Sequence, residues 1–461
     1  MKKKTGVLKF LASLKLAVVV IVALGAMTAW GTFVEAKFDA EAATKLVYNS
    51  VYMYALMGLF AVNLIAVMVD RWPWQEKHTG FVLAHIGLLL LLLGAWMTKF
   101  YGVDGSMTIN LGEKSKAVVV GQTDLTLYSS MDASRYTKMS DREVDFFLDR
   151  PTEKKPYELK MGAGSLKVID YLPYGFREQK ILETKDDANG AAVRFQLQNP
   201  NVSVTEWLLQ PGAGRFVQKD LGPAQMIFGN IEGQGVDKSK NSIVLIPKGD
   251  VIAYEIHTAR TPGAVKRGTA KPGDTIETGW MGLVLRVLKY MPHAKEEISF
   301  KANEVPTPLT TGAILVDFNG TKHWVAINSM LKLFTDQAVY ILMYANRRLD
   351  LDFELKLKDF KIGRYPGTMR AASYESVVDV PTKGDTTISM NEPLKHGGYT
   401  IYQSSFSENE NGPYASIFSV NKDPGRWVKY LGCLAIVFGS IHLFYFKRKT
   451  RPKNAASSAM D

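Results

Sequence analysis

The chain alternates between four long apolar runs and one long region of mixed polarity. The apolar runs lie at about 16–34, 51–69, 81–98 and 428–446. Each run is long enough to cross the roughly 30 Å hydrocarbon core of a bilayer as an α-helix. The region between the third and fourth runs contains no comparable stretch. The pattern therefore predicts an integral membrane protein with four transmembrane helices and one large domain outside the bilayer.

The large domain alternates apolar and polar residues in short stretches. The clearest stretch is LDLDFELKLKDF, and shorter ones occur at 117–120, 124–128 and 314–318. Turns such as Asn319-Gly320 separate the stretches. We therefore expect a mostly antiparallel β domain of the sandwich or barrel type. The stretch 329–344 is a candidate amphipathic helix, and the sequence leaves open whether the domain has one core or two.

Basic residues flank the first and last runs and predict the orientation of the chain. Lys2, Lys3, Lys4, Lys9 and Lys15 precede the first run, and Lys447, Arg448, Lys449, Arg451 and Lys453 follow the last. The positive-inside rule then places both tails in the cytoplasm and the large domain outside. The expected segments are a basic tail at 1–15, three spans within 16–100, the extracytoplasmic β-rich domain at 101–425, a fourth span at 426–447 and a second basic tail at 448–461.

The net charge of +11 mainly reflects these tails. The rest of the chain is nearly balanced, so we expect no nucleic-acid-binding surface. The single cysteine, Cys433, lies in the last run and excludes Cys-x-x-Cys redox and haem-attachment motifs. A large exported domain without disulfides suits a bacterial periplasm, which indicates the bacterial inner membrane. Val34-Glu35-Ala36 resembles a signal-peptide cleavage site, but the long run and the spans that follow favour an uncleaved anchor.

One histidine, His85, lies inside the third apolar run. Ionisable residues in membrane spans are costly, usually face a cavity or a partner, and often mark a functional path. A neutral imidazole in apolar surroundings is a suitable ligand for haem iron. The alternative is an imidazole that hydrogen-bonds to a neighbouring helix or an interfacial water. Gly80, Gly87 and Gly94 recur every seven residues on the opposite side of the helix, where we expect close contact with another helix.

A second histidine, His442, lies near the expected cytoplasmic end of the last run. His85 lies near the cytoplasmic start of the third run, so the sequence places the two histidines at similar depth. His442 is therefore a second candidate haem ligand, and the alternative is an interfacial residue. The large domain shows no metal-ligand spacing, Walker loop or nucleophile elbow, so no catalytic residue is predicted.

Several segments resemble the ResB (CcsB) family. They are FLASLKLAVVV, HTGFVLAHIGLLLLLLGAW with its exit at 99–107, the block 391–406, and Asp423-Pro424-Gly425. The resemblance implies a component of the System II cytochrome c synthase, a haem lyase complex that carries haem b across the membrane and presents it to apocytochrome c. It also implies a multi-span ResC (CcsA) partner, with thiol-reducing factors as further candidates. The matching family position makes His85 the axial haem ligand, with the second ligand expected from the partner.

Two other interpretations stay open at this point. In the first, the chain is a scaffold that stabilises the ResC-type partner without binding haem, and His85 is a packing residue. Alternatively, it is an anchored exported binding protein unrelated to haem, against which the block 391–406 argues. In the synthase interpretation the covalent chemistry belongs to the complex, because nothing in this sequence supplies a nucleophile or an obvious acid–base pair.

Overall fold

The fold is described from a computed structural model that covers residues 6–131, 135–161, 164–221, 224–230, 240–259, 265–407 and 414–446. The expected cytoplasmic tail at 448–461 and the first five residues of the tail at 1–15 lie outside these ranges. The chain divides into two compact units. One unit contains residues 1–174 and 304–461, and the other contains Gly175–Asn303.

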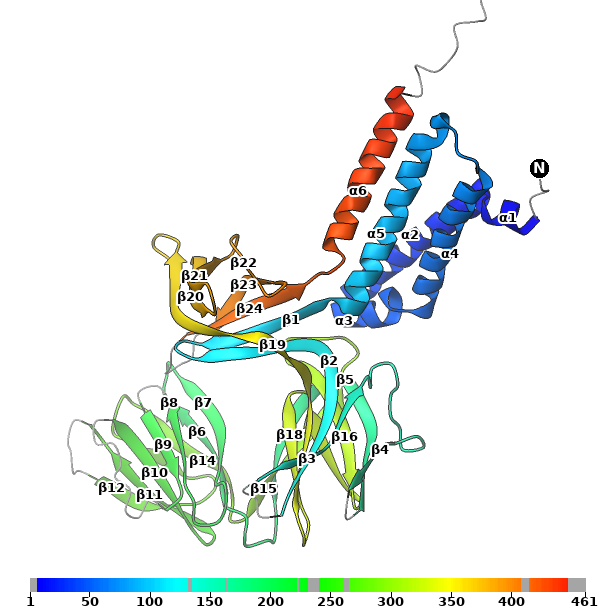
Figure 1. Ribbon diagram of the computed structural model, residues 1–461. Coiled ribbons are helices and arrows are strands. Elements are labelled where there is room, and N and C mark those ends of the chain that lie inside the picture. The colour runs from blue at the N-terminus through cyan, green and yellow to red at the C-terminus, as the bar shows by residue number, and fades with distance from the viewer. Residues whose placement is uncertain are drawn as a thin grey trace, which may run out of the picture. The chain divides into compact units, whose positions relative to one another are not determined.

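Within the described residues, four helices of the first unit are long and apolar enough to cross a membrane (Figure 1). They are α2 (Leu14–Lys37), α4 (Val51–Asp70), α5 (Thr79–Tyr101) preceded by the short turn η2 (Glu76–His78), and α6 (Arg426–Ile441) continued by the π-helical turn η3 (His442–Phe446). The four predicted spans are therefore confirmed. Shorter helical segments are α1 (Gly6–Leu11), α3 (Ala40–Ala43) and η1 (Thr44–Tyr48).

Serine caps define where the first two spans begin. The Ser13 hydroxyl accepts a hydrogen bond from the Leu16 amide, and the Ser50 hydroxyl accepts one from Met53. Each cap satisfies an amide that has no partner inside its helix. The side-chain amide of the buried Asn63 in α4 donates a 2.6 Å hydrogen bond to the carbonyl of Leu11. Leu11 is the last residue of α1, before the helix is interrupted and α2 begins. This bond provides a partner for a backbone group that a helix end leaves unpaired.

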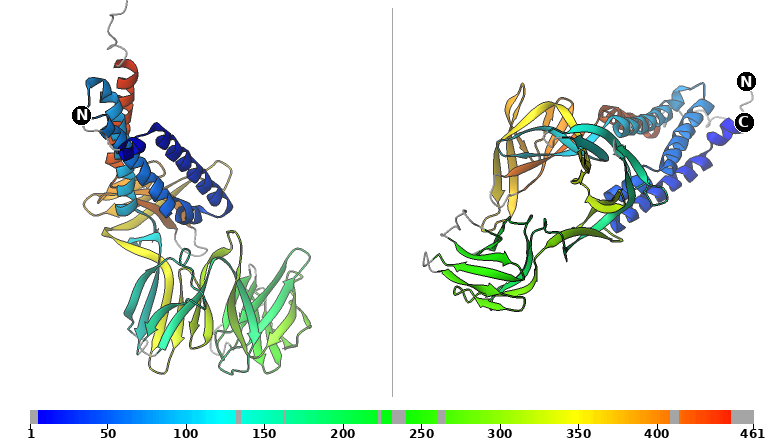
Figure 2. Two further views of the ribbon diagram at one scale, coloured as in Figure 1. Left: turned by 90° about the vertical axis from the view of Figure 1, so that its right-hand side faces the viewer. Right: turned by 90° about the horizontal axis from the view of Figure 1, so that it is seen from below.

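The glycine stripe of α5 forms the contact with α6, and the two helices lie side by side in every view (Figures 1 and 2). A Cβ atom placed on Gly87 would lie 2.6 Å from the Gly432 carbonyl oxygen, and one on Gly80 would lie 2.7 Å from that of Gly439. Such distances leave no room for a side chain. The expectation that the stripe presses against another helix is confirmed, and its partner carries glycines at the facing positions.

The helix pair continues directly into a pair of strands. Strand β1 follows α5, strand β24 precedes α6, and the two pair antiparallel with Val103 opposite Lys422. Ten described strands form this sheet: β1 (Val103–Asn110), β2 (Lys114–Ser130), β3 (Thr137–Val144), β18 (Ser329–Phe334), β19 (Val339–Arg364), β20 (Ala371–Val380), β21 (Gly384–Ser389), β22 (Leu394–His396), β23 (Tyr399–Ser407) and β24 (Ala415–Lys422). Its main path is β21-β20-β19-β2-β1-β24-β23-β22, with β3 beside β2 and β18 beside β19.

The long strands β2 and β19 each contribute to two hydrophobic cores. Leu127 and Tyr344 belong to one core, together with residues of β4 (Tyr157–Met161), β5 (Gly164–Glu183), β16 (Thr310–Phe318) and β17 (Thr321–Ala326). Val118 and Leu355 belong to the other core, together with β1, β20 and β24. The pairing of β19 with β2 shifts register between Asn346 and Arg348, between these two parts of β19.

The unit 175–303 is a sandwich of two sheets around one core. Its strands are the end of β5 with β6 (Ala192–Gln198), β7 (Ser203–Leu209), β8 (Val217–Leu221), β9 (Ala224–Phe228), β10 (Asn241–Lys248), β11 (Val251–His257), β12 (Val265–Ala270), β13 (Thr275–Glu277), β14 (Val284–Met291) and β15 (Ala294–Ala302). The two sheets have the orders β12-β11-β10-β9-β8 and β13-β14-β6-β7. Fully buried residues such as Phe195 and Phe228 fill the core between them. The predicted β-rich domain is confirmed.

The candidate helix at 329–344 is wrong. This stretch forms β18 and the start of β19, which pair antiparallel with Leu331 opposite Leu342. Tyr340, Leu342 and Tyr344 are buried in alternation, which is the period of a strand.

Candidate functional site

His85 lies on α5, on the side away from α6. Gly80 and Gly87 both contact α6, and the helical repeat of 100° per residue places His85 roughly 150° around the axis from them. The imidazole is half-buried, and its neighbours along the helix are apolar. The accessible part of His85 therefore lies on the face of α5 opposite the contact with α6.

A hydrogen bond determines which nitrogen of His85 is available. Nδ1 lies 2.8 Å from the carbonyl oxygen of Phe81, one turn earlier in the helix. Because a carbonyl oxygen only accepts, Nδ1 carries the proton, and in the neutral ring Nε2 keeps its lone pair. Metal-binding histidines commonly use this arrangement, since the bond to a carbonyl orients the ring and selects the tautomer. Nε2 of His85 thus keeps the lone pair that a metal ligand needs.

Phe81 connects His85 to a cation. The Phe81 and His85 rings have centroids 3.9 Å apart, and the guanidinium carbon of Arg71 lies 3.8 Å from the Phe81 centroid. The sequence analysis did not find this cluster. Phe81 lies four residues before His85, a spacing that brings side chains together on a helix. Arg71 precedes α5 in the chain, and no local spacing indicates that it reaches Phe81.

The residues around His85 fit a haem group as a one-ligand site. The neutral ring donor and its apolar surroundings suit a macrocycle that is itself apolar. The described residues contain no group of three or more His, Cys, Asp and Glu side chains that could hold a metal ion. His78, seven residues before His85, accepts a hydrogen bond from the Gln75 amide and caps the short turn η2.

The structure does not place His442 at the depth of His85. His442 begins η3, and its ring stacks on Phe446 with centroids 5.8 Å apart. Gly87 faces Gly432, and Gly80 faces Gly439, so His442 is level with the residues just before α5. This is roughly 12 Å along the helix axis from His85. His85 also lies on the far side of α5, so one iron atom cannot take both as axial ligands within one chain. His442 as a ligand elsewhere stays a prediction.

A partly buried polar cluster lies at the other end of the helix pair. The carboxylate of Asp423 accepts hydrogen bonds from Thr98 at 2.6 Å and from Lys429 at 2.8 Å. Burial alone would raise the pKa of Asp423, but the bonds from Lys429 and Thr98 outweigh it and hold the pKa below its usual range. Asp423 belongs to a segment that resembles the ResB family, and its position suggests a structural role.

A second ion cluster ties η1 to the β domain. Nζ of Lys45 lies 2.9 Å from carboxylate oxygens of both Glu41 and Asp145. Burial would lower the pKa of Lys45, yet the hydrogen bonds to these two carboxylates raise it above its usual value. Lys45 also lines a groove of about 900 Å³, together with Lys99 at the end of α5 and Lys422 at the end of β24.

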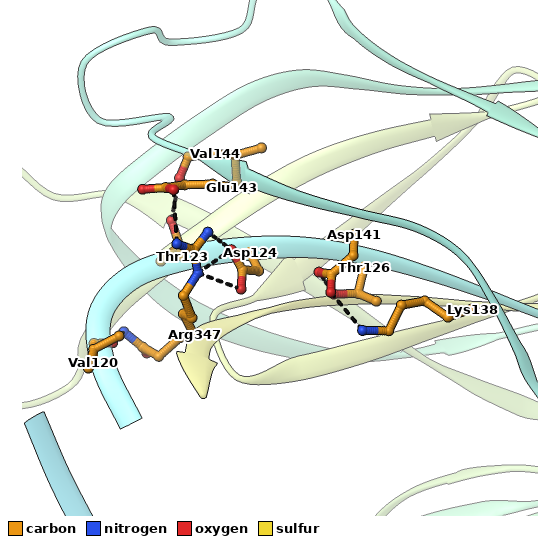
Figure 3. Close-up of polar contacts among 10 residues, drawn as sticks. Val120, Thr123, Asp124, Thr126, Lys138, Asp141, Glu143, Val144 and Arg347 are labelled. Atoms are coloured by element: carbon orange, nitrogen blue, oxygen red, sulfur yellow. Dashed lines mark hydrogen bonds and ion pairs between the residues drawn. The ribbon is translucent and has the colours of Figure 1, made fainter. Parts of the chain in front are cut away.

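Arg347 lies at the register shift of β19 and joins three strands (Figure 3). Its guanidinium donates two hydrogen bonds to the Asp124 carboxylate, from Nε to Oδ2 at 3.0 Å and from Nη2 to Oδ1 at 2.6 Å, and Nη1 lies 2.9 Å from Glu143. The hydrogen bond to Asp124 raises the pKa of Arg347. Partial loss of hydration acts in the opposite direction and is the smaller effect. The network connects β2, β3 and β19 where the two cores separate.

The four histidines of the large domain are not assembled into a site. His396 packs edge-on against Phe353 with ring centroids 4.6 Å apart. His257 and His293 each lie 3.6 Å from a carboxylate, Glu255 and Asp187 respectively. His323 pairs with Val316 across β16 and β17.

The fold defines a class of protein, in which four spans carry a large β-rich domain between the third and fourth. Residues 328–415, which run from β18 to the first residue of β24, match the model of the ResB-like family. The chain is also similar to Protein NrfI of Wolinella succinogenes, with 24% identity over 431 residues. This alignment covers 91% of the chain and 33% of NrfI, so the chain spans about a third of the length of that relative. The resemblance to the ResB family is therefore confirmed.

Proposed function

We propose that this protein acts in cytochrome c biogenesis, as the part of a System II synthase that binds haem b within the membrane. The resemblance to the ResB family supports the pathway. The hydrogen bond between His85 Nδ1 and the Phe81 carbonyl is the observation that supports haem binding by this chain, because it leaves Nε2 available to iron. A multi-span ResC (CcsA) partner supplies the second axial ligand.

Each part of the site has a separate task in this proposal. His85 provides one axial nitrogen, the Phe81 carbonyl keeps its ring oriented, and the apolar faces of the spans exclude water. Haem, when bound, supplies the vinyl groups to which the thiols of apocytochrome c add. We assign the covalent step to the complex with the partner and not to this chain.

The proposed location is the bacterial inner membrane, with both termini in the cytoplasm and the β-rich domain outside. The distribution of basic residues supports this orientation. It places the groove beside Lys45 and Lys99 at the outer end of the spans. The domain then stands beside the external site of the partner, where apocytochrome c is received.

A scaffold that stabilises the partner without binding haem is the alternative function. The extensive β domain and the glycine contact of α5 with α6 suit both functions. The free Nε2 of His85 favours the haem-binding function, since a packing residue has no need of an oriented, unpaired nitrogen.

The test is the absorption spectrum of the complete protein, co-purified with its ResC-type partner. We expect His85→Ala to weaken or shift the haem Soret band, and added imidazole to restore it. His78→Ala removes an imidazole from the same helix face and is expected to leave the band unchanged. An unchanged Soret band in His85→Ala, with an intact complex, would refute haem ligation and favour the scaffold. His442→Ala tests the second candidate ligand separately.

A further inference from the structure

We infer that Arg71 binds a carboxylate of the haem that His85 holds through its iron. This inference rests on the proposed function. Arg71 and His85 both contact the ring of Phe81. Its centroid lies 3.8 Å from the guanidinium carbon of Arg71 and 3.9 Å from the centroid of the His85 ring, so the guanidinium and the imidazole lie close together. A cation and a candidate iron ligand thus lie on either side of one ring, with Arg71 in the loop after α4 and His85 in α5.

The stacking geometry leaves the donors of Arg71 free to act. The guanidinium carbon lies close to the Phe81 ring centre, so the ring covers one side of the cation. The five N–H donors of a guanidinium point outward in its plane, and a planar carboxylate accepts two of them together. Arg71 is also exposed. It therefore offers an accessible fork for a carboxylate.

The position of Arg71 agrees with the shape of haem. Haem carries its two propionates on one edge, and the remaining edges are apolar. Arg71 follows the last residue of α4, whereas His85 lies six residues inside α5. An iron bound at His85 with the propionates directed to Arg71 would keep the carboxylates at the end of the spans and the apolar edges among the helices. The opposite orientation would place the carboxylates in hydrocarbon, at a large free-energy cost.

The two tryptophans of the same loop make contacts of their own. Trp72 and Trp74 contact each other with centroids 5.0 Å apart, and Trp74 donates to the Met68 carbonyl. They suit the headgroup region, where amphipathic rings gather. Lys77 is the other basic residue of the loop and is equally exposed. Lys77 provides the matched control, since its substitution removes the same charge from the same loop.

The experiment compares two probes, haem and haem dimethyl ester, which lacks the carboxylates but keeps the iron. Both are titrated into the full chain with its partner, for the wild type, Arg71→Gln, Lys77→Gln and His85→Ala. We expect Arg71→Gln to weaken haem binding about tenfold or more, as the loss of a charged hydrogen-bonded pair implies. We expect it to leave ester binding unchanged, and Lys77→Gln to bind both probes like the wild type.

The outcomes separate the two proposals. Equal haem affinity in Arg71→Gln and wild type would overturn the role of Arg71, and would point to a lipid phosphate as its anion. An equal loss for haem and ester would also overturn it, because Arg71 would then act only through the position of Phe81. A wild type that binds neither probe, or His85→Ala with an unchanged spectrum, would refute the proposed function itself.

Discussion

The hydroxyl of Thr98 donates a 2.6 Å hydrogen bond to the carboxylate of Asp423, across 325 residues of sequence. Thr98 belongs to the last turns of α5, and Asp423 precedes α6. Nζ of Lys429 bonds both residues, at 2.9 Å to Thr98 and 2.8 Å to Asp423. The cluster therefore joins the helix pair at the point where it continues into β1 and β24.

Asp423→Asn is expected to destabilise the protein by about 1–3 kcal/mol, because it leaves the partly buried Lys429 without its counter-charge. The measurement is thermal unfolding of the complete protein in detergent. Thr98→Ser keeps a hydroxyl at the same place and is the matched control, with a smaller expected loss. Wild-type stability in Asp423→Asn would show that the cluster contributes nothing to the junction.

The same carboxylate predicts a pH dependence. The pKa of Asp423 is lowered in the folded protein, so its contribution to stability is complete above the unfolded value of about 4. The contribution is lost as the pH falls through the lower folded value. The stability difference between wild type and Asp423→Asn should therefore be constant near neutral pH and shrink below about pH 4. A difference that grows on acidification would contradict the assignment.

The glycine contact predicts an unusual sensitivity to small side chains. Gly87→Ala is expected to lower stability by about 1–3 kcal/mol, because its Cβ would lie 2.6 Å from the Gly432 carbonyl oxygen. Gly58→Ala on α4 is the matched control, since nothing lies within 4 Å of its Cβ. The control should be neutral or slightly stabilising, as alanine favours helices. Thermal unfolding of both variants tests this, and equal behaviour would mean that α5 and α6 do not pack through their glycines.

Arg347→Lys is expected to cost about 1–3 kcal/mol, although it keeps the positive charge. Lysine cannot donate the two parallel bonds that Arg347 makes to Asp124, nor reach Glu143 at the same time. Lys138→Gln, which breaks the exposed ion pair with Asp141, is the control and should leave the unfolding temperature unchanged. If both substitutions changed the unfolding temperature equally, the Arg347 network would be no more important for stability than an exposed ion pair.

Local patterns were sufficient for the parts of the fold that repeat along the chain. The apolar runs predict the four spans because a helix must shield its backbone across the bilayer. The seven-residue spacing of Gly80, Gly87 and Gly94 predicts a helix contact, and the alternation at 349–360 predicts a strand. The stretch 329–344 failed as a helix because its apolar residues alternate with period two on either side of a turn.

The tertiary structure alone decided which distant residues meet. The pairing of α5 with α6 joins residues hundreds of positions apart, and so do the contacts of Asp423 and Arg347. The division of the β-rich region between two units is likewise not visible in any local pattern. Periodicity carries no information on such pairs, since it reports only which face of one element is apolar. The same holds at the proposed site: the sequence identified His85 by its place in an apolar span, whereas Arg71 joins it through Phe81 only because α4 and α5 are packed together.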